Sequence, residues 1–248
     1  MMKKKLFLLI VIVTAIVDFS CKKNEAPVQN TNNLPPAGSR VKTRSVNGSI
    51  TSYEYDASGR ATKWVSNNKL YYDFVYNADS LLETEYKSDG SIKGAHHIKL
   101  NASGYVENYL NTEFPFIFIK YEYNANGTKA MQYNYDHGNL NSVTRFFYNN
   151  GNLVKDSAYS PSGSGWNGRL YEYYTDKYTS TENENIGVRY WGTGNKNALK
   201  KITYLNTGVI SGTQDFQVPQ SDALNRTTQT SYLTNGAGTP VVVIYTYY

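Results

Sequence analysis

The sequence predicts an all-β protein: an antiparallel meander of tandem β-hairpins whose long twisted sheet curls toward a half-barrel. Three observations predict this class: a pattern that recurs about every 23 residues, an excess of tyrosine, and no convincing helical period. The chain has 248 residues with 24 Tyr, 9 Phe and 3 Trp, but one Cys and three His. This composition excludes a disulfide scaffold and a cysteine-based metal centre, and it disfavours full disorder.

The N-terminus has the features of a bacterial secretion signal, which we assign to residues 1–20. Lys3–Lys5 form a basic start, and the apolar stretch Leu6–Val17 follows. This stretch is shorter than the roughly 20 residues that a spanning helix needs. It therefore indicates a signal core rather than a membrane span.

Ser20 and Cys21, where the apolar stretch ends, resemble the lipobox of bacterial lipoproteins, whereas Asp18 and Phe19 depart from it. The resemblance implies that Cys21 is lipidated and becomes the first mature residue. An ordinary secretion signal with an incidental Cys is the alternative. Residues 21–39 are rich in Asn, Pro and Thr without a hydrophobic period, so we expect a flexible tether between the anchor and a folded domain.

Residues 40–248 are predicted to form a single β-repeat domain built from copies of one pattern. Each copy has an apolar residue, any residue, an aromatic residue, Asp or Asn, and a short turn that usually contains Gly. The Asp or Asn side chain favours the turn because it accepts backbone hydrogen bonds, and Gly suits the left-handed position. The anchor residues of successive copies are Tyr55, Tyr76, Leu100, Tyr123, Tyr148 and Tyr173.

The stacked copies predict two columns of apolar side chains on one face of the sheet. The sixth copy, at Tyr173, has lost the turn consensus. Beyond it we expect a seventh turn at Asp222–Arg226 and a closing strand at Val241–Tyr248. One column consists of the anchors, and the other consists of Tyr53, Phe74, Ile98, Tyr121, Phe146 and Tyr171.

The segment Tyr55–Arg60, with the letters YDASGR, resembles the signature of the YD-repeat family, also named RHS repeats. Later copies keep the first pair and most of the turn but lose the Arg, so the resemblance covers roughly residues 50–175. In the large relatives such hairpins coil into a hollow shell, and this chain is too short for one. The resemblance implies a Gram-negative YD-repeat lipoprotein of unassigned function, at the outer membrane on its periplasmic face or the cell surface.

No motif indicates catalysis, a metal or a cofactor, so we expect none of these. Gly163–Gly168 matches G-x-G-x-x-G, but Pro161 precedes it and a strand-like segment follows, which favours a hairpin loop. The adjacent His96 and His97 point to opposite faces of a strand and are not expected to share a metal. Three glutamates at one repeat position are expected to be solvated, with glycan hydrolysis as an alternative function: Glu54, Glu122 and Glu172.

The candidate ligand contacts are the tryptophans Trp64, Trp166 and Trp191. Planar side chains on an exposed sheet can stack on sugar rings or anchor a protein, and neighbouring Gly residues favour display of Trp166 and Trp191 in loops. The formal charge of +5 includes no basic run that would indicate nucleic-acid binding. We expect a membrane-anchored extracytoplasmic module that binds a glycan or a protein. The alternative is an envelope structural protein that associates through sheet edges.

Overall fold

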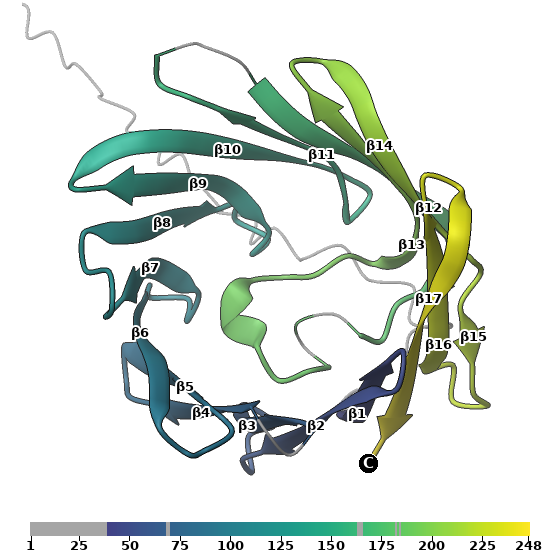
Figure 1. Cartoon of the computed structure of the whole chain (residues 1–248), viewed down its shortest axis with the longest axis horizontal. Helices are drawn as coiled ribbons and strands as arrows, with labels where there is room; N and C mark the ends of the chain where they lie inside the picture. The colour runs from purple at the N-terminus through teal and green to yellow at the C-terminus, as the bar shows by residue number, and fades with distance from the viewer. Residues whose placement is uncertain (1–38, 68–69, 163–165, 182, 184) are drawn as a thin grey trace, which may run out of the picture. The chain divides into compact units, whose positions relative to one another are not determined.

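The computed structural model describes residues 39–67, 70–162, 166–181, 183 and 185–248. These residues form 17 β-strands and one short 3-10 helix (Figure 1). No helix among them is long and apolar enough to cross a membrane. The predicted signal at 1–20, the lipidation site Cys21 and nearly all of the tether lie outside the described residues.

The strands follow one another along the chain with short turns between most of them. Their bounds are β1 Val41–Val46, β2 Ser49–Tyr55, β3 Ala61–Ser66, β4 Leu70–Tyr76, β5 Ser80–Tyr86, β6 Ile92–Leu100, β7 Val106–Asn111, β8 Ile117–Tyr123, β9 Lys129–Asp136, β10 Asn139–Asn149, β11 Asn152–Tyr159, β12 Trp166–Tyr178, β13 Asn197–Asn206, β14 Val209–Phe216, β15 Gln220–Ser221, β16 Thr227–Thr234 and β17 Ala237–Tyr247, and the 3-10 helix η2 is Arg189–Trp191.

The sheet closes into a barrel, so the predicted half-barrel is wrong. β1 pairs with β2 on one side and with β17 on the other, and antiparallel pairing continues around the ring (Figure 1). All strands except the two-residue β15 belong to this ring of 16 strands. The closing pair joins residues about 200 positions apart in the chain, and no local pattern encodes such a contact.

Closure changes how the sheet can meet other molecules. In a closed ring each strand has a hydrogen-bonded neighbour on both sides, which removes the free edges of an open sheet. Within the described residues only the short β15 keeps an open side. The alternative of association through sheet edges therefore loses its structural basis in this part of the chain.

The turns that carry the repeat consensus all lie at one end of the barrel, hereafter the turn end. The chain enters and leaves the barrel at this end, where the Tyr248 N–H donates to the Arg40 carbonyl at 3.1 Å. The hairpin turns that alternate with them form the opposite end, hereafter the distal rim. The turn-end connections follow β2, β4, β6, β8, β10 and β12, and the distal ones follow β1, β3, β5, β7, β9, β11 and β13.

The side chain of Asp56 organises the first consensus turn. Its Oδ1 accepts the backbone N–H of Arg60 at 2.9 Å, and its Oδ2 accepts the Arg60 Nε–H at 2.7 Å. Gly59 takes a left-handed φ of 74°, which a side chain would disfavour. Asp222 makes the same two bonds to Arg226 at 2.9 and 2.8 Å, which confirms the predicted turn at 222–226.

The sixth copy has no turn, and there the chain leaves the wall. β12 runs on to Tyr178, and residues 185–196, hereafter the plug, lie inside the ring of strands (light green in Figure 1). The Ala61 N–H donates to the Gly187 carbonyl at 2.9 Å. The Thr193 N–H donates to the Gly127 carbonyl, also at 2.9 Å. The plug is therefore hydrogen-bonded to two separate parts of the wall.

The hydrophobic core lies between the plug and the wall formed by β3–β8. The predicted columns face this core in the first four copies, because Phe74, Ile98 and Tyr121 are buried in it and the anchors pack beside them. Tyr53 is buried as well. The core cluster comprises Ala61, Phe74, Leu81, Ile98, Val106, Tyr121, Val188 and Tyr190, with Tyr55, Tyr76, Leu100 and Tyr123 packed against it.

Candidate binding site in the barrel lumen

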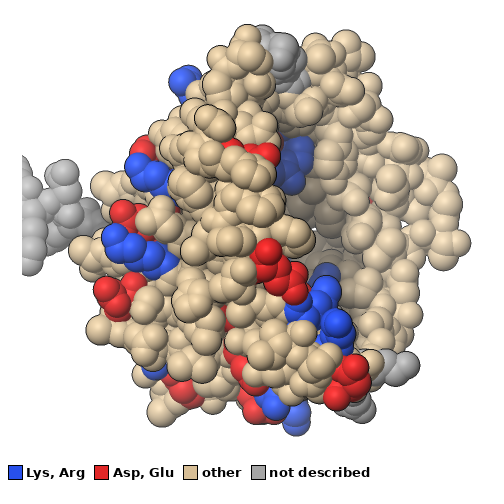
Figure 2. Space-filling view, turned by 60° about the vertical axis from the view of Figure 1, so that its left-hand side comes forward, with Lys and Arg blue, Asp and Glu red and all other residues tan. Residues whose placement is uncertain are grey.

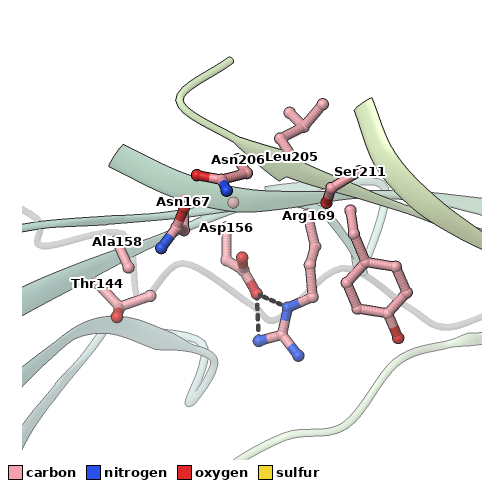
Figure 3. A pocket seen from close by; sticks show the side chains of 10 residues that line it. Thr144, Asp156, Ala158, Asn167, Arg169, Leu205, Asn206 and Ser211 are labelled. Atoms are coloured by element: carbon pink, nitrogen blue, oxygen red, sulfur yellow. Dashed lines mark hydrogen bonds and ion pairs between the residues drawn. The ribbon is translucent and has the colours of Figure 1, made fainter. Parts of the chain in front are cut away.

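A polar pocket of about 490 Å³ lies on the inner wall formed by β10–β14 (Figure 3). Figure 2 shows that the molecule is hollowed, with basic side chains inside the hollow. Six side chains supply most of the polar groups and the aromatic ring of the pocket: Thr144, Asp156, Asn167, Arg169, Tyr204 and Asn206.

The strand pleat turns these side chains toward the lumen. The Tyr173 hydroxyl donates to Oδ1 of Asn195 in the plug at 3.1 Å, so this face of β12 looks inward. Alternate residues of a strand share a face, which places Arg169 and Asn167 on the same side. Leu205, by contrast, points to the other side of the strands in Figure 3.

A buried carboxylate holds the central cation of the pocket. Asp156 is 3% exposed, and its Oδ2 accepts Nε–H of Arg169 at 2.8 Å and the Tyr171 hydroxyl at 2.7 Å (Figure 3). Nη2 of Arg169 lies 2.6 Å from the same oxygen. Burial opposes the charge on Arg169, but these hydrogen bonds outweigh it and raise the pKa of Arg169. Burial and the nearby carboxylate also raise the pKa of Tyr171.

This arrangement suits recognition of a ligand rich in hydroxyl groups. A guanidinium has five N–H donors, so its contacts with one carboxylate oxygen leave others for the lumen. The amides of Asn167 and Asn206 and the hydroxyl of Thr144 add donors and acceptors around it. The ring of Tyr204 offers an apolar face, and its hydroxyl is oriented by a 2.9 Å bond to Oε1 of Gln214.

Sequence reasoning did not find this pocket, because it treated charged strand positions as solvated. The hairpin register held a signal: Asp156 lies directly opposite Phe146, a member of the predicted apolar column. A carboxylate at an inward position must be paired, and Arg169 lies opposite it on the next strand. Counting residues outward from the two hairpin turns places Asp156 opposite Arg169 and would have predicted this ion pair.

Trp64 and Trp191 both pack against the interior core and do not form an exposed site. Trp64 lies inside the barrel with its ring 5.0 Å from that of Phe74. Trp191 belongs to the plug, and the Lys129 ammonium lies 4.7 Å from its ring. Both rings pack within the interior rather than being displayed outside. Trp166 begins β12, and its side chain lies outside the described atoms.

The repeat-position glutamates lie on the outer face of the barrel, away from the pocket. Glu54 pairs across strands with Lys63, and Glu172 pairs with Lys201. Glu122 Oε1 lies 3.5 Å from Nζ of Lys120. These contacts agree with the expected solvated carboxylates.

The described part of the chain contains no group of three or more His, Cys, Asp or Glu side chains placed to hold a metal. His96 lies opposite Glu83, whereas its neighbour His97 lies opposite Leu82 on the other face. Of the G-x-G-x-x-G stretch, the described residues Trp166–Gly168 already belong to β12, so the strand begins three residues earlier than the predicted hairpin loop allows. A dinucleotide site would need a helix there.

Comparison with known proteins identifies the fold. No protein-family model matches the chain, and no curated protein matches it. A porin-like protein from Bacteroides uniformis is similar over 85% of this chain and 94% of its own, with a TM-score of 0.58 and 12% identity. A porin-like protein from Bacteroides vulgatus is similar over 85% and 99%, with a TM-score of 0.50 and 10% identity. The likeness shows a closed, porin-like antiparallel β-barrel.

Proposed function

We propose that this chain is a binding module of the cell envelope that holds a hydroxyl-rich ligand, such as a glycan segment, in its lumen. The observation that carries the proposal is the pocket around the Asp156–Arg169 pair. The buried Asp156 carboxylate fixes the position of the half-exposed Arg169 guanidinium, so a ligand would meet donors that are already ordered. Ordered polar groups beside an aromatic ring are typical of sites for small polar molecules.

The envelope location rests on two separate supports. The first is the signal-like N-terminus with Cys21 at its end, which favours a lipid anchor. The second is the porin-like fold of the barrel. The resemblance of Tyr55–Arg60 to the YD-repeat signature leads us to the separate hypothesis that the chain is related in sequence to YD-repeat lipoproteins. Catalysis is not part of the proposal.

The proposal is tested by screening the full chain against a glycan array and measuring the affinity of any ligand by calorimetry. The double variant Asn167→Ala/Asn206→Ala removes two amides from the pocket. Its affinity should fall by about 5-fold to 150-fold, since each lost hydrogen bond costs roughly 0.5–1.5 kcal/mol. Asn108→Ala is the matched control, because Asn108 lies on the outer face opposite Lys99 and should leave the affinity unchanged. Equal affinity in all three proteins would rule out the pocket as the binding site.

A further inference from the structure

The outer face of the barrel carries an apolar girdle beside the distal rim. Tyr71 stacks on Tyr86 at 4.5 Å, and Phe118 stacks on Tyr135 at 4.3 Å. These rings point outward, because Tyr72, the neighbour of Tyr71, packs against the core. The corresponding rim position on several other strands is also apolar or aromatic, at Ile50, Val65, Leu110, Tyr159 and Leu205.

The hairpin tips beyond the girdle also expose large apolar side chains. Ile92 is 62% exposed and Ile210 is 66% exposed, on two different hairpins. A third connection exposes Phe114 by 48% and Phe116 by 39%. Scattered exposed apolar residues are ordinary, but a set that follows one rim across several hairpins indicates an interaction surface.

Toward the turn end the outer face becomes charged. Nζ of Lys99 lies 3.0 Å from Oε2 of Glu107, and Nζ of Lys201 lies 3.6 Å from Oδ1 of Asp215. Lys120 comes only two residues after Phe118 along β8. The apolar band is therefore shallow, about one outward residue deep along each strand.

We propose that the distal rim docks onto a lipid bilayer and enters it only to the depth of this girdle. A bilayer fits the surface because the apolar groups lie on several separate hairpins of one rim rather than in a groove. Tyr and other aromatic side chains favour the interface, where the ring is buried and the hydroxyl stays wet. The charged residues that follow stop deeper entry, since charges in hydrocarbon are costly. Interfacial elements of this kind insert their apolar face about 5–10 Å deep into the boundary between headgroups and acyl chains.

The chain before the barrel is long enough to permit this orientation. The first and last residues of the barrel chain lie at the turn end, where the Tyr248 N–H donates to the Arg40 carbonyl. The predicted anchor would therefore attach on the side away from the distal rim. Residues 21–38, from Cys21 to the residue before Ser39, number 18. At about 3.4 Å per residue they can span roughly 60 Å. The longest strand, β12, has 13 residues and spans roughly 40 Å at most.

The test is flotation of the full chain with vesicles of phosphatidylcholine and phosphatidylglycerol. Cys21→Ser is present in every protein, so that a lipid at Cys21 cannot contribute. The rim variant combines Phe114→Ser, Phe116→Ser and Ile210→Ser, all at exposed positions. We expect the parent to float with the vesicles and the rim variant to lose at least tenfold in partitioning.

The matched control combines Val75→Ser, Val218→Ser and Leu224→Ser, which are 55%, 54% and 54% exposed and lie toward the turn end. It should float like the parent. The proposal is overturned if the parent does not float, or if the control loses as much as the rim variant. Sedimentation showing a dimer that only the rim variant abolishes, without vesicle binding, would assign the rim to a second copy of the chain. Neither result depends on ligand binding in the lumen.

Discussion

The two sides of the barrel interior differ in what covers them. The side formed by β3–β8 is lined by apolar and aromatic residues such as Ile98 and Tyr121, and the plug residues Val188 and Tyr190 pack on it. The side formed by β10–β14 carries Asp156, Arg169 and other polar groups around an open pocket. One half of the lumen is therefore a hydrophobic core, and the other half is an open, polar surface.

This difference shows how a barrel of repeated hairpins can be filled on one side only. A closed ring of this size encloses more space than its own inward side chains fill. The chain supplies the missing core from the connection between β12 and β13, where the repeat loses its turn. The irregular copy thus stabilises the fold by packing its connection against the wall of the regular copies, and the wall formed by β10–β14 stays uncovered around the pocket.

The largest expected effect comes from displacing the plug. In Gly187→Ala, the new Cβ would lie 2.6 Å from the backbone nitrogen of Ala61 and 2.7 Å from Cε1 of Tyr55. Gly187 also has φ +75°, so the free energy of unfolding should fall by about 3 kcal/mol or more. Urea denaturation followed by tryptophan fluorescence measures this loss.

Gly90→Ala is the control for that variant. Gly90 has φ +82° with nothing within 4 Å of a Cβ, so it should cost only the backbone strain of about 1–2 kcal/mol. Equal losses in the two variants would show that the plug contributes little to stability, and the comparison of the two halves would fail.

A smaller effect should appear as a pH dependence of the plugged half. Burial, and then the charge of Glu85, raises the pKa of Glu83 to about 7 from an ordinary 4.5. The folded chain therefore holds a proton that the unfolded chain releases between these values. Stability is greatest below pH 4.5 and is lost as the pH rises through 7, by about 1–3 kcal/mol.

Thermal unfolding between pH 4.5 and pH 8 measures this slope. Glu83→Gln should flatten it, because the neutral amide cannot release a proton. Glu54→Gln, on the outer face opposite Lys63, should keep the parent profile. A slope that survives Glu83→Gln would assign the pH dependence to a group other than Glu83. The half-buried His96 is not that group, because burial lowers its pKa and so makes stability rise with pH.

The smallest effect concerns one hydroxyl of the plug. The Tyr190 hydroxyl is buried and makes no hydrogen bond of good geometry to the described residues, with the adjacent Trp191 side chain as a polar neighbour, so Tyr190→Phe should change the free energy of unfolding by less than about 1 kcal/mol. Tyr55→Phe should instead cost about 0.5–1.5 kcal/mol, because its hydroxyl donates to the Val41 carbonyl at 2.6 Å. A clear loss in Tyr190→Phe, measured by the same denaturation, would mean that the hydroxyl is satisfied in solution.

Local chemistry made much of this molecule predictable. The Asp56 and Asp222 turns, the strand character of the chain and the inward columns all arise from contacts within a hairpin or between neighbours. The pocket was not predicted, because the pairing of Asp156 with Arg169 depends on register across two hairpins. The roles of Trp64 and Trp191 also depend on the plug, which packs against strands more than 60 residues earlier in the chain.

The amino-acid sequence by itself determined the repeat unit, its alternation of inward and outward faces, and the position at which the repeat breaks. The tertiary structure alone decided that β1 meets β17, that the plug fills one side of the lumen, and that a pocket remains on the other. The physical reason is range: turns and pleats are set by neighbours in the chain, whereas closure and filling depend on the summed twist of all strands and the volume that they enclose.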